Sequence, residues 1–502
     1  MAIDTATDTR PAIASDTSGI GGHPAGLTTL FLTEMWERFS YYGMRALLVL
    51  FLKAAIENGG FALSAVTATA IYGLYTSSVY LVMLPGGWIA DRILGYRRAV
   101  FVGGIIIAAG HFSMALGWVV SFYLGLVLIV IGTGLLKPNV SAIVGDLYPE
   151  GGARRDAGFS VFYMGINLGA FIGPLVCGYL GENVNWHLGF AAAGVGMVFG
   201  VIQYRLGFKR MGTAGIRQLD ATERVRAFRT LMAGVALVVL IIVVLALLNS
   251  RSVVNLNPKK VAESLGFVIA GIAVLYFGYQ LIFGGFDATE KKRIVVILVL
   301  FIAATMFWCG FEQAGSSMNL FAKEYTNRVF FGKEIPASWL QSVNPLLIIA
   351  FAPVFGSLWV KLRDRQPSIP AKFALGLIQL GVGFAVVAWA SVYVGNTSNP
   401  NKVSAGWLIA TYFFHTTGEL CLSPVGLSAM TKLSPAKLVG QMMGIWFLAT
   451  SFGNLMAGLL AGRMESMGLV QLFSSVALWT AAVGLVLLLT SRPVKRLMGG
   501  VK

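Results

Sequence analysis

The apolar residues of this chain are gathered in repeated runs, each about twenty or more residues long, with short polar connections between them. An α-helix of roughly twenty residues crosses the ~30 Å hydrocarbon core of a bilayer. Hydrophobic residues make up 56% of the chain before glycine is counted, against about 45–50% with glycine included in soluble domains. The sequence therefore predicts an all-α membrane protein with fourteen transmembrane helices, at 27–52, 66–90, 97–117, 120–145, 157–181, 187–206, 226–249, 262–284, 292–316, 337–361, 370–394, 404–431, 437–461 and 468–490.

The connections predict orientation and organisation. Most of the 38 lysines and arginines lie in loops on the side shared by both termini, which predicts cytoplasmic termini and explains the net charge of +16 without a nucleic-acid partner. The first 26 residues lack the basic start and apolar core of a secretory signal. We expect a mobile cytoplasmic tail at 1–26, a six-helix bundle at 27–206, a basic linker at 207–225, an inserted transmembrane hairpin at 226–284, a second six-helix bundle at 292–490 and a basic cytoplasmic tail at 491–502. Two six-helix halves are the layout of a transporter with a site near the midplane.

Composition argues against several other classes. The three cysteines each lie inside an apolar run, without a CxxC pair or clustered histidines, so we expect no disulfide framework, metal site or cofactor. No nucleophile, base and orienting group cluster together, which argues against an enzyme.

The loop "GGWIADRILGYRR", residues 86–98, combines glycines, one acid and several bases between two spans. It resembles the loop motif of the major facilitator superfamily. The resemblance implies that Asp91, next to Arg92, caps and pairs with a neighbouring helix end, while the glycines allow close helix approach. The alternative is an ordinary charged turn.

The first span carries several charges in the segment "LTEMWERFSYYGMR", residues 32–45. A charge at the bilayer centre costs about 2.5–3.5 kcal/mol on insertion scales, so it is normally retained for function. Glu34, Arg38, Tyr41 and Arg45 share one helix face, flanked by Glu37 and Tyr42. The alternative is a self-neutralising ladder of ion pairs that only packs the bundle.

The pattern Glu34-x-x-Glu37-Arg38-Phe-x-Tyr-Tyr-Gly43 resembles the first-helix signature of the proton-dependent oligopeptide transporter family. The resemblance extends from residue 27 to about 490 and includes the extra hairpin of bacterial members. It implies a monomeric, proton-coupled importer of di- and tripeptides in the bacterial cytoplasmic membrane, working by alternating access. Proton coupling is expected at Glu34, Glu37 and Arg38.

Three later spans also carry charges: Lys137 beside Pro138, Glu312 one turn after Trp308, and Glu419 before an expected helix break at Pro424. Arg45 and Glu312 each lie about 18–20 residues along outward-running spans, whereas Lys137 and Glu419 lie about 15–17 residues along inward-running ones. Depth in the membrane therefore permits two pairs, Arg45 with Glu312 and Lys137 with Glu419. The family resemblance implies the same pairs as gates, Arg45 with Glu312 outside and Lys137 with Glu419 inside.

The remaining polar groups suit a zwitterionic peptide. Arg38 and Lys137 could hold its carboxylate, and Asn167, Asn344 and Glu419 its ammonium group. Backbone and side chains would then meet the aromatic residues Tyr41, Tyr42, Tyr80, Trp308 and Trp446. For each aromatic residue alone, core packing or anchoring at the membrane interface is an equal alternative.

Two features leave alternatives open. Gly165, Gly169 and Gly173 chiefly permit close helix approach, but their segment also resembles a motif of drug/proton antiporters, the second functional candidate. His415 could relay protons, or be a hydrogen-bonded structural residue. A receptor or scaffold with the same fold is a third possibility.

Overall fold

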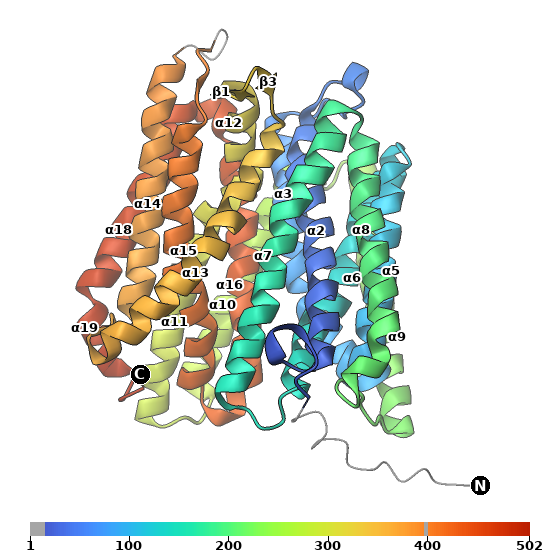
Figure 1. The fold of residues 1–502 in the computed structure, drawn as a ribbon, viewed down its shortest axis with the longest axis vertical. Coiled ribbons are helices and arrows are strands. Elements are labelled where there is room, and N and C mark those ends of the chain that lie inside the picture. Colours follow the sequence, from blue (N-terminus) through green and yellow to red (C-terminus); the bar gives the residue numbers. More distant parts are fainter. Residues whose placement is uncertain (1–15, 396–399, 502) are drawn as a thin grey trace. The chain divides into compact units, whose positions relative to one another are not determined.

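The computed structural model describes residues 16–395 and 400–501, with the side chains of Asp364, Leu427 and Ala436 excepted, and this part of the chain is largely helical (Figure 1). Twelve helical segments within it are long and apolar enough to cross a membrane. The first and twelfth expected spans coincide with two further long helices, α2 (Ala25–Lys53) and α15 (Gly406–Leu433), which carry charged residues. The predicted all-α membrane architecture is confirmed. The number of spans reaches the expected fourteen only if α2 and α15 are counted with the twelve segments.

The packing divides the chain into two compact units. Unit 1 takes in the described part of Met1–Met44 together with Val82–Leu256, and unit 2 takes in Arg45–Leu81 together with the described part of Asn257–Lys502. Besides the start of α2, unit 1 contains η1 (Ile20–Gly22), α4 (Met83–Ile89), η3 (Ala90–Leu94), α5 (Tyr96–Ala115), α6 (Val119–Asp146), α7 (Gly152–Asn183), α8 (Trp186–Leu206), η4 (Gly207–Met211) and α9 (Ala221–Ser250).

Unit 2 contains the end of α2 and the remaining elements of the described chain. Its helices are η2 (Ile56–Asn58), α3 (Ala65–Leu81), α10 (Pro258–Phe283), α11 (Ala288–Phe311), η5 (Glu312–Gly315), α12 (Ser317–Tyr325), η6 (Ala337–Ser342), α13 (Val343–Leu362), η7 (Arg363–Arg365), α14 (Ile369–Val394), α15, η8 (Ala436–Leu438), α16 (Val439–Ala461), α17 (Met464–Met467), α18 (Leu469–Leu489) and α19 (Ser491–Leu497). Unit 2 also contains two short strand pairs. Strand β1 (Thr326–Asn327) pairs with β4 (Val403–Ser404) in parallel, and β2 (Val329–Phe330) pairs with β3 (Lys333–Glu334) in antiparallel orientation.

The boundaries of these two packing units are not those of the two six-helix bundles expected from the sequence, and the bundles stay a prediction. Helix α3 packs with the C-terminal helices, because Gly73 of α3 meets Gly458 of α16 at backbone distance and Ser77 shares a 2.7 Å hydrogen bond with Ser451. The end of α2 belongs to unit 2 as well. The physical reason is that small residues on α3 and α16 let two backbones touch.

The expected hairpin is divided too, since α9 falls in unit 1 and α10 in unit 2. Nearly all of α9 is exposed, Ala227 being its one buried residue, whereas α10 buries part of one face against α3 and α16. Exposed apolar side chains along a span of this kind are suited to lipid contact.

The chain makes defined contacts within unit 1 from Asp16 onward, ahead of the boundary expected at residue 27. The Asp16 carboxylate accepts hydrogen bonds from the Ser18 hydroxyl and the backbone N–H of Ala25, and these bonds lower the pKa of Asp16. His23 lies 2.9 Å from the Tyr148 hydroxyl. Residues 1–15 of the expected tail lie outside the described residues.

The expected linker and C-terminal tail are also held by hydrogen bonds. Arg97 donates to the carbonyl oxygens of Gly212 and Ala214 at 2.6 Å each. The C-terminal tail begins as helix α19, and Arg293 donates to the Met498 carbonyl oxygen at 3.2 Å.

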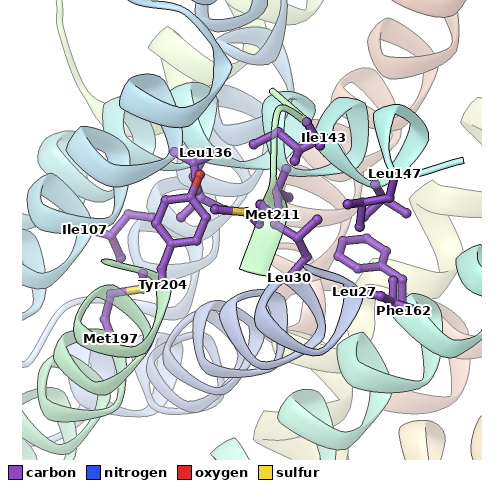
Figure 2. Packing of buried hydrophobic residues seen from close by; sticks show 14 of the residues in the cluster. Leu27, Leu30, Ile107, Leu136, Ile143, Leu147, Phe162, Met197, Tyr204 and Met211 are labelled. Atoms are coloured by element: carbon purple, nitrogen blue, oxygen red, sulfur yellow. The ribbon is translucent and has the colours of Figure 1, made fainter. Parts of the chain in front are cut away.

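A cluster of apolar side chains forms a core within unit 1 (Figure 2). It draws residues from five helices and η4, including Leu27, Leu30, Ile107, Leu136, Ile143, Phe162, Met197, Tyr204 and Met211. In unit 2, α14 runs beside α15 and α18 (Figure 1). The unit 1 core thus packs against α2 and α6, which carry charged side chains, and α15, which carries Glu419, packs against α14.

The glycines of α7 lie against α2. A Cβ on Gly169 would meet the Met35 carbonyl oxygen, one on Gly173 would meet the Phe39 carbonyl oxygen, and one on Gly165 would lie 2.9 Å from the Phe31 ring. The close-approach interpretation of these glycines is confirmed. Packing explains their spacing fully, so the glycines do not favour the antiporter alternative.

The expected helix break after Glu419 is wrong. Helix α15 continues through Pro424 to Leu433. A proline removes one backbone donor and excludes one hydrogen bond, but neighbouring helices can hold the rest of the segment in place. An interruption occurs instead in the ninth expected span, where η5 separates α11 from α12.

We predict that Gly169→Ala lowers the thermal midpoint of the purified protein in detergent. The added methyl group would overlap the α2 backbone, and overpacking of this kind typically costs about 1–3 kcal/mol. Gly234→Ala is the matched control, because nothing lies within 4 Å of a Cβ there and the same change favours a helix. Equal midpoints for the two variants would contradict the packing role of Gly169.

Candidate functional site

Arg38 is the centre of a buried charge cluster on α2. Its side chain is bound in bidentate fashion by the adjacent Glu37, with Nη2 to Oε1 at 2.6 Å and Nε to Oε2 as the second bond. Nε also lies 3.3 Å from Oε1 of Glu34, one turn earlier. All three residues are at most 1% exposed. Glu37, expected to flank the stripe, is therefore the principal partner of Arg38.

A second cation completes this cluster. Lys137 of α6 interacts electrostatically with Glu34 within unit 1. The set holds two carboxylates and two cations and is formally neutral. The two glutamates differ in how they are held, because both oxygens of Glu37 bind Arg38, whereas Glu34 Oε2 has no hydrogen-bond partner among the described residues. We refer to Glu34, Glu37, Arg38 and Lys137 as the charge cluster.

Two tyrosines enclose the guanidinium of Arg38. Its Cζ lies 4.9 Å from the ring centroid of Tyr41 and 5.9 Å from that of Tyr42, within the range of cation–π attraction. The two rings meet edge to face at 5.2 Å. These residues surround a charge, which a purely apolar packing role does not require.

Unit 2 contains the expected outer pair. Arg45 Nη1 donates to Glu312 Oε2 at 2.6 Å, and both side chains are at most 7% exposed. Glu312 opens η5 at the end of α11, and the Tyr72 hydroxyl donates to its carbonyl oxygen at 3.4 Å. The Tyr72 hydroxyl thus helps to hold the backbone of the residue that binds Arg45.

Two of the three residues expected to bind an ammonium group meet in unit 2. Asn344 Nδ2 donates to Glu419 Oε2 at 3.3 Å and to the Thr416 hydroxyl at 2.9 Å. Asn167 lies in unit 1 and donates to the Tyr163 carbonyl oxygen of its own helix at 3.0 Å. Lys137 belongs to unit 1 and Glu419 to unit 2.

Thr416 was missed by the sequence analysis. It precedes Glu419 by three residues, so the two share a helix face, and this spacing is the signal that could have identified it.

The expected aromatic residues of unit 2 make close packing contacts. Trp446 packs beneath Gly426 and beside Phe373, whereas Trp308 meets Phe311 edge to face at 5.5 Å. Tyr80 lies near the end of α3 and is half-buried.

His415 is also enclosed by aromatic rings, those of Phe384 at 4.8 Å and Phe311 at 6.4 Å between centroids. These contacts give His415 a packing role on the α15 face beside α14.

The superfamily-type loop lies at the surface of unit 1. Asp91 and Arg92 are exposed on η3, and Arg92 Nη1 lies 3.5 Å from Glu223 Oε2 of α9. A Cβ on Gly86 would meet the Gly134 carbonyl oxygen, so α4 and α6 touch at backbone level. Gly86 therefore allows the close approach expected of this loop, whereas nothing lies within 4 Å of a Cβ on Gly87.

The three cysteines, Cys177, Cys309 and Cys421, are free and buried. Across residues 16–395 and 400–501, no group of three or more His, Cys, Asp or Glu side chains is placed to hold a metal ion.

Comparison with known proteins gives consistent matches. A family model described as the POT family matches residues 97–473. The peptide transporter YePEPT of Yersinia enterocolitica is 44% identical over 496 residues, covering 95% of this chain and 96% of that protein. A di-/tripeptide transporter of Lactococcus lactis subsp. cremoris is 37% identical over 492 residues, covering 96% and 98%. A crystal structure of a peptide transporter POT in complex with sulfate has a TM-score of 0.89 at 41% identity, covering 98% of this chain and 99% of that one.

We predict that Glu312→Gln lowers the thermal midpoint in detergent much more than the double change Arg45→Met with Glu312→Met. The single change breaks the buried ion pair and removes the carboxylate that Arg45 binds at 2.6 Å, which typically costs about 3–5 kcal/mol, whereas an apolar pair removes both charges. Lys53→Gln with Glu324→Gln serves as a control, since that 2.6 Å pair is partly exposed. Its loss should cost ~1 kcal/mol or less. A double variant as unstable as Glu312→Gln would contradict this account.

Proposed function

Because the chain belongs to the POT family, we propose that it is a proton-coupled symporter that imports di- and tripeptides by alternating access. The relatives that it matches along nearly their whole length are named peptide or di-/tripeptide transporters. A transporter releases its substrate chemically unchanged, so we assign it no catalysis and no cofactor other than the coupling proton. We propose that it works as a monomer in the bacterial inner membrane with both termini in the cytoplasm, as its basic loops favour.

One observation carries the coupling mechanism: the formally neutral charge cluster, whose members are all buried except the half-buried Lys137. Burying charged groups is costly unless each is paired. A peptide carboxylate that binds Arg38 and Lys137 would bring one more negative charge than the two cations can balance. Release of a glutamate from its cation and its neutralisation by a proton would restore the balance. Proton and peptide would then enter together.

The two glutamates would divide this task unequally. Glu37 holds Arg38 through two bonds, whereas Glu34 has one oxygen near Arg38 and one without a described hydrogen-bond partner. Displacing Glu37 requires the peptide carboxylate to take over a bidentate site of the same geometry. Protonating Glu34 requires no such exchange of partners.

The remaining roles are assigned on the chemistry of each group. The peptide ammonium would be held by Asn167, Asn344 and Glu419, the last two being hydrogen-bonded to each other. Peptide backbone and side chains would meet an aromatic set made up of Tyr41, Tyr42, Tyr80, Trp308 and Trp446.

We assign gating to two ion pairs. Arg45 with Glu312 would close the outer side, and Lys137 with Glu419 the inner side, each pair breaking when the other forms. The first is formed at 2.6 Å. Lys137 would then serve the inner gate, the peptide carboxylate and the charge cluster in turn.

We predict that blocking either terminus of a dipeptide weakens its binding. Losing one hydrogen bond to a charged group costs ~1.5–3 kcal/mol. The measurement is competition against a labelled dipeptide in proteoliposomes. A dipeptide modified by the same group on a side chain, with both termini free, is the control. Equal competition by free and blocked dipeptides would refute the binding sites assigned to the peptide carboxylate and ammonium group.

We predict that Glu37→Gln, and separately Glu34→Gln, abolishes dipeptide uptake driven by a pH gradient and preserves exchange of peptide down its own gradient. An amide keeps the size of the side chain but cannot take up the coupling proton. Uptake and counterflow are measured in proteoliposomes acidified outside.

The control for these variants is Glu150→Gln, a change at a cytoplasmic carboxylate that pairs with Arg154 at 3.5 Å. It should leave both activities unchanged. Concentrative uptake by the double variant of Glu34 and Glu37 would refute the coupling role of the charge cluster.

A further inference from the structure

Asn344 lies in the first turn of α13 and meets two residues one helical turn apart on α15. Its Nδ2 is 2.9 Å from the Thr416 hydroxyl and 3.3 Å from Glu419 Oε2. Thr416 is fully buried and Glu419 is 9% exposed, whereas Asn344 is only half-buried. The three side chains form one hydrogen-bonded set within unit 2, which we call the amide set.

The hydrogen-bonding capacity of the amide group fixes its orientation. An asparagine amide has two N–H donors and one carbonyl acceptor. Both donors are used, one by Thr416 and one by Glu419, so the carbonyl oxygen Oδ1 points away from both. The amide carbonyl and the Glu419 carboxylate are then two acceptors of one hydrogen-bonded set, which suits an ammonium group with three donors.

We propose that Thr416 is a positioning residue for recognition of the peptide ammonium group, acting through Asn344. This inference rests on the proposed function, because it deepens the amine site assigned there. Glu419 alone cannot hold the amide throughout, since its carboxylate is itself expected to bind the ammonium. The neutral hydroxyl of Thr416 does not compete for the ligand and keeps Nδ2 turned away from it. A reversed amide would present two N–H donors to a cation and repel it.

The neighbouring residue offers a contrast. Thr417 uses its hydroxyl within its own helix, donating to the carbonyl oxygens of Phe413 at 3.0 Å and Phe414 at 3.1 Å. Such local bonding is the usual role of a helical threonine. The Thr416 hydroxyl instead accepts a hydrogen bond from another helix. Charged groups that interact with Glu419 inside unit 2 are Arg45 and Glu312, and they act on the carboxylate rather than on the amide.

The test compares dialanine with its desamino analogue, N-propionyl-alanine, which has the same skeleton without the ammonium group. Binding of both is measured on the full-length protein in detergent for the unmodified chain and for Thr416→Val, Thr416→Ser and Thr417→Val. Valine keeps the shape of threonine and removes the acceptor. We expect Thr416→Val to bind dialanine about 3- to 10-fold more weakly, the effect of one neutral hydrogen bond. Its affinity for the desamino analogue should not change.

The two other variants should bind both ligands as the unmodified chain does. Thr416→Ser keeps the hydroxyl, and Thr417→Val alters a hydroxyl that does not contact Asn344. If Thr416→Val does not fold, Thr416→Ala removes the same acceptor with a smaller side chain and supports the same comparison.

The possible failures are distinguishable. If the unmodified chain binds dialanine and its desamino analogue equally well, the ammonium group is not recognised. That result would refute both the amine site and the positioning role of Thr416. If it prefers dialanine and Thr416→Val or Thr416→Ala retains the same preference, the inference alone is overturned. Equal weakening of both ligands in those variants would also overturn it, because a general structural effect does not distinguish them.

Discussion

The burial of the Arg38 guanidinium is the constraint on which the rest of this structure depends. In a low-dielectric surrounding a fixed cation must be matched by anions at hydrogen-bond distance. Glu37 supplies two bonds, Glu34 supplies a carboxylate one turn away, and Lys137 balances the additional negative charge. The charge cluster is satisfied only as a set, so any ligand that takes one of its members changes the charge balance of the others. That property suits coupling between a proton and a zwitterionic substrate.

The helix that carries these charges is fixed by backbone contact. Gly165, Gly169 and Gly173 of α7 let α2 approach so closely that a methyl group at Gly169 would meet a carbonyl oxygen. This close contact leaves no room for a larger side chain between α2 and α7 at these positions. A similar close backbone contact occurs in unit 2, where Gly73 of α3 packs against Gly458 of α16. Small residues thus provide the rigidity that buried charges require.

The polar groups of unit 2 follow a different pattern. Arg45 and Glu312 form a simple ion pair, whereas Asn344 is held by a neutral hydroxyl and a carboxylate together. The two members of an ion pair resist separation until another charged group takes the place of one of them. An amide with both donors bound has a defined acceptor and needs no change in charge to bind a cation. The ion pair suits a contact that opens and closes. The amide suits a contact that recognises a ligand.

The sequence by itself determined the membrane class, the positions of the spans and the neighbourhood of Glu34, Glu37 and Arg38, because apolar length and spacing along one helix are local properties. It also indicated the Arg45–Glu312 pair through helix depth and family resemblance. Only the tertiary structure decided that α3 packs with α16, that α15 continues through Pro424, and that Thr416 binds Asn344. Those outcomes depend on side chains far apart in the chain: Thr416 is 72 residues from Asn344, and Ser77 is 374 residues from Ser451. Helical periodicity fixes which residues share a face of one helix, and it cannot fix which helix that face will meet.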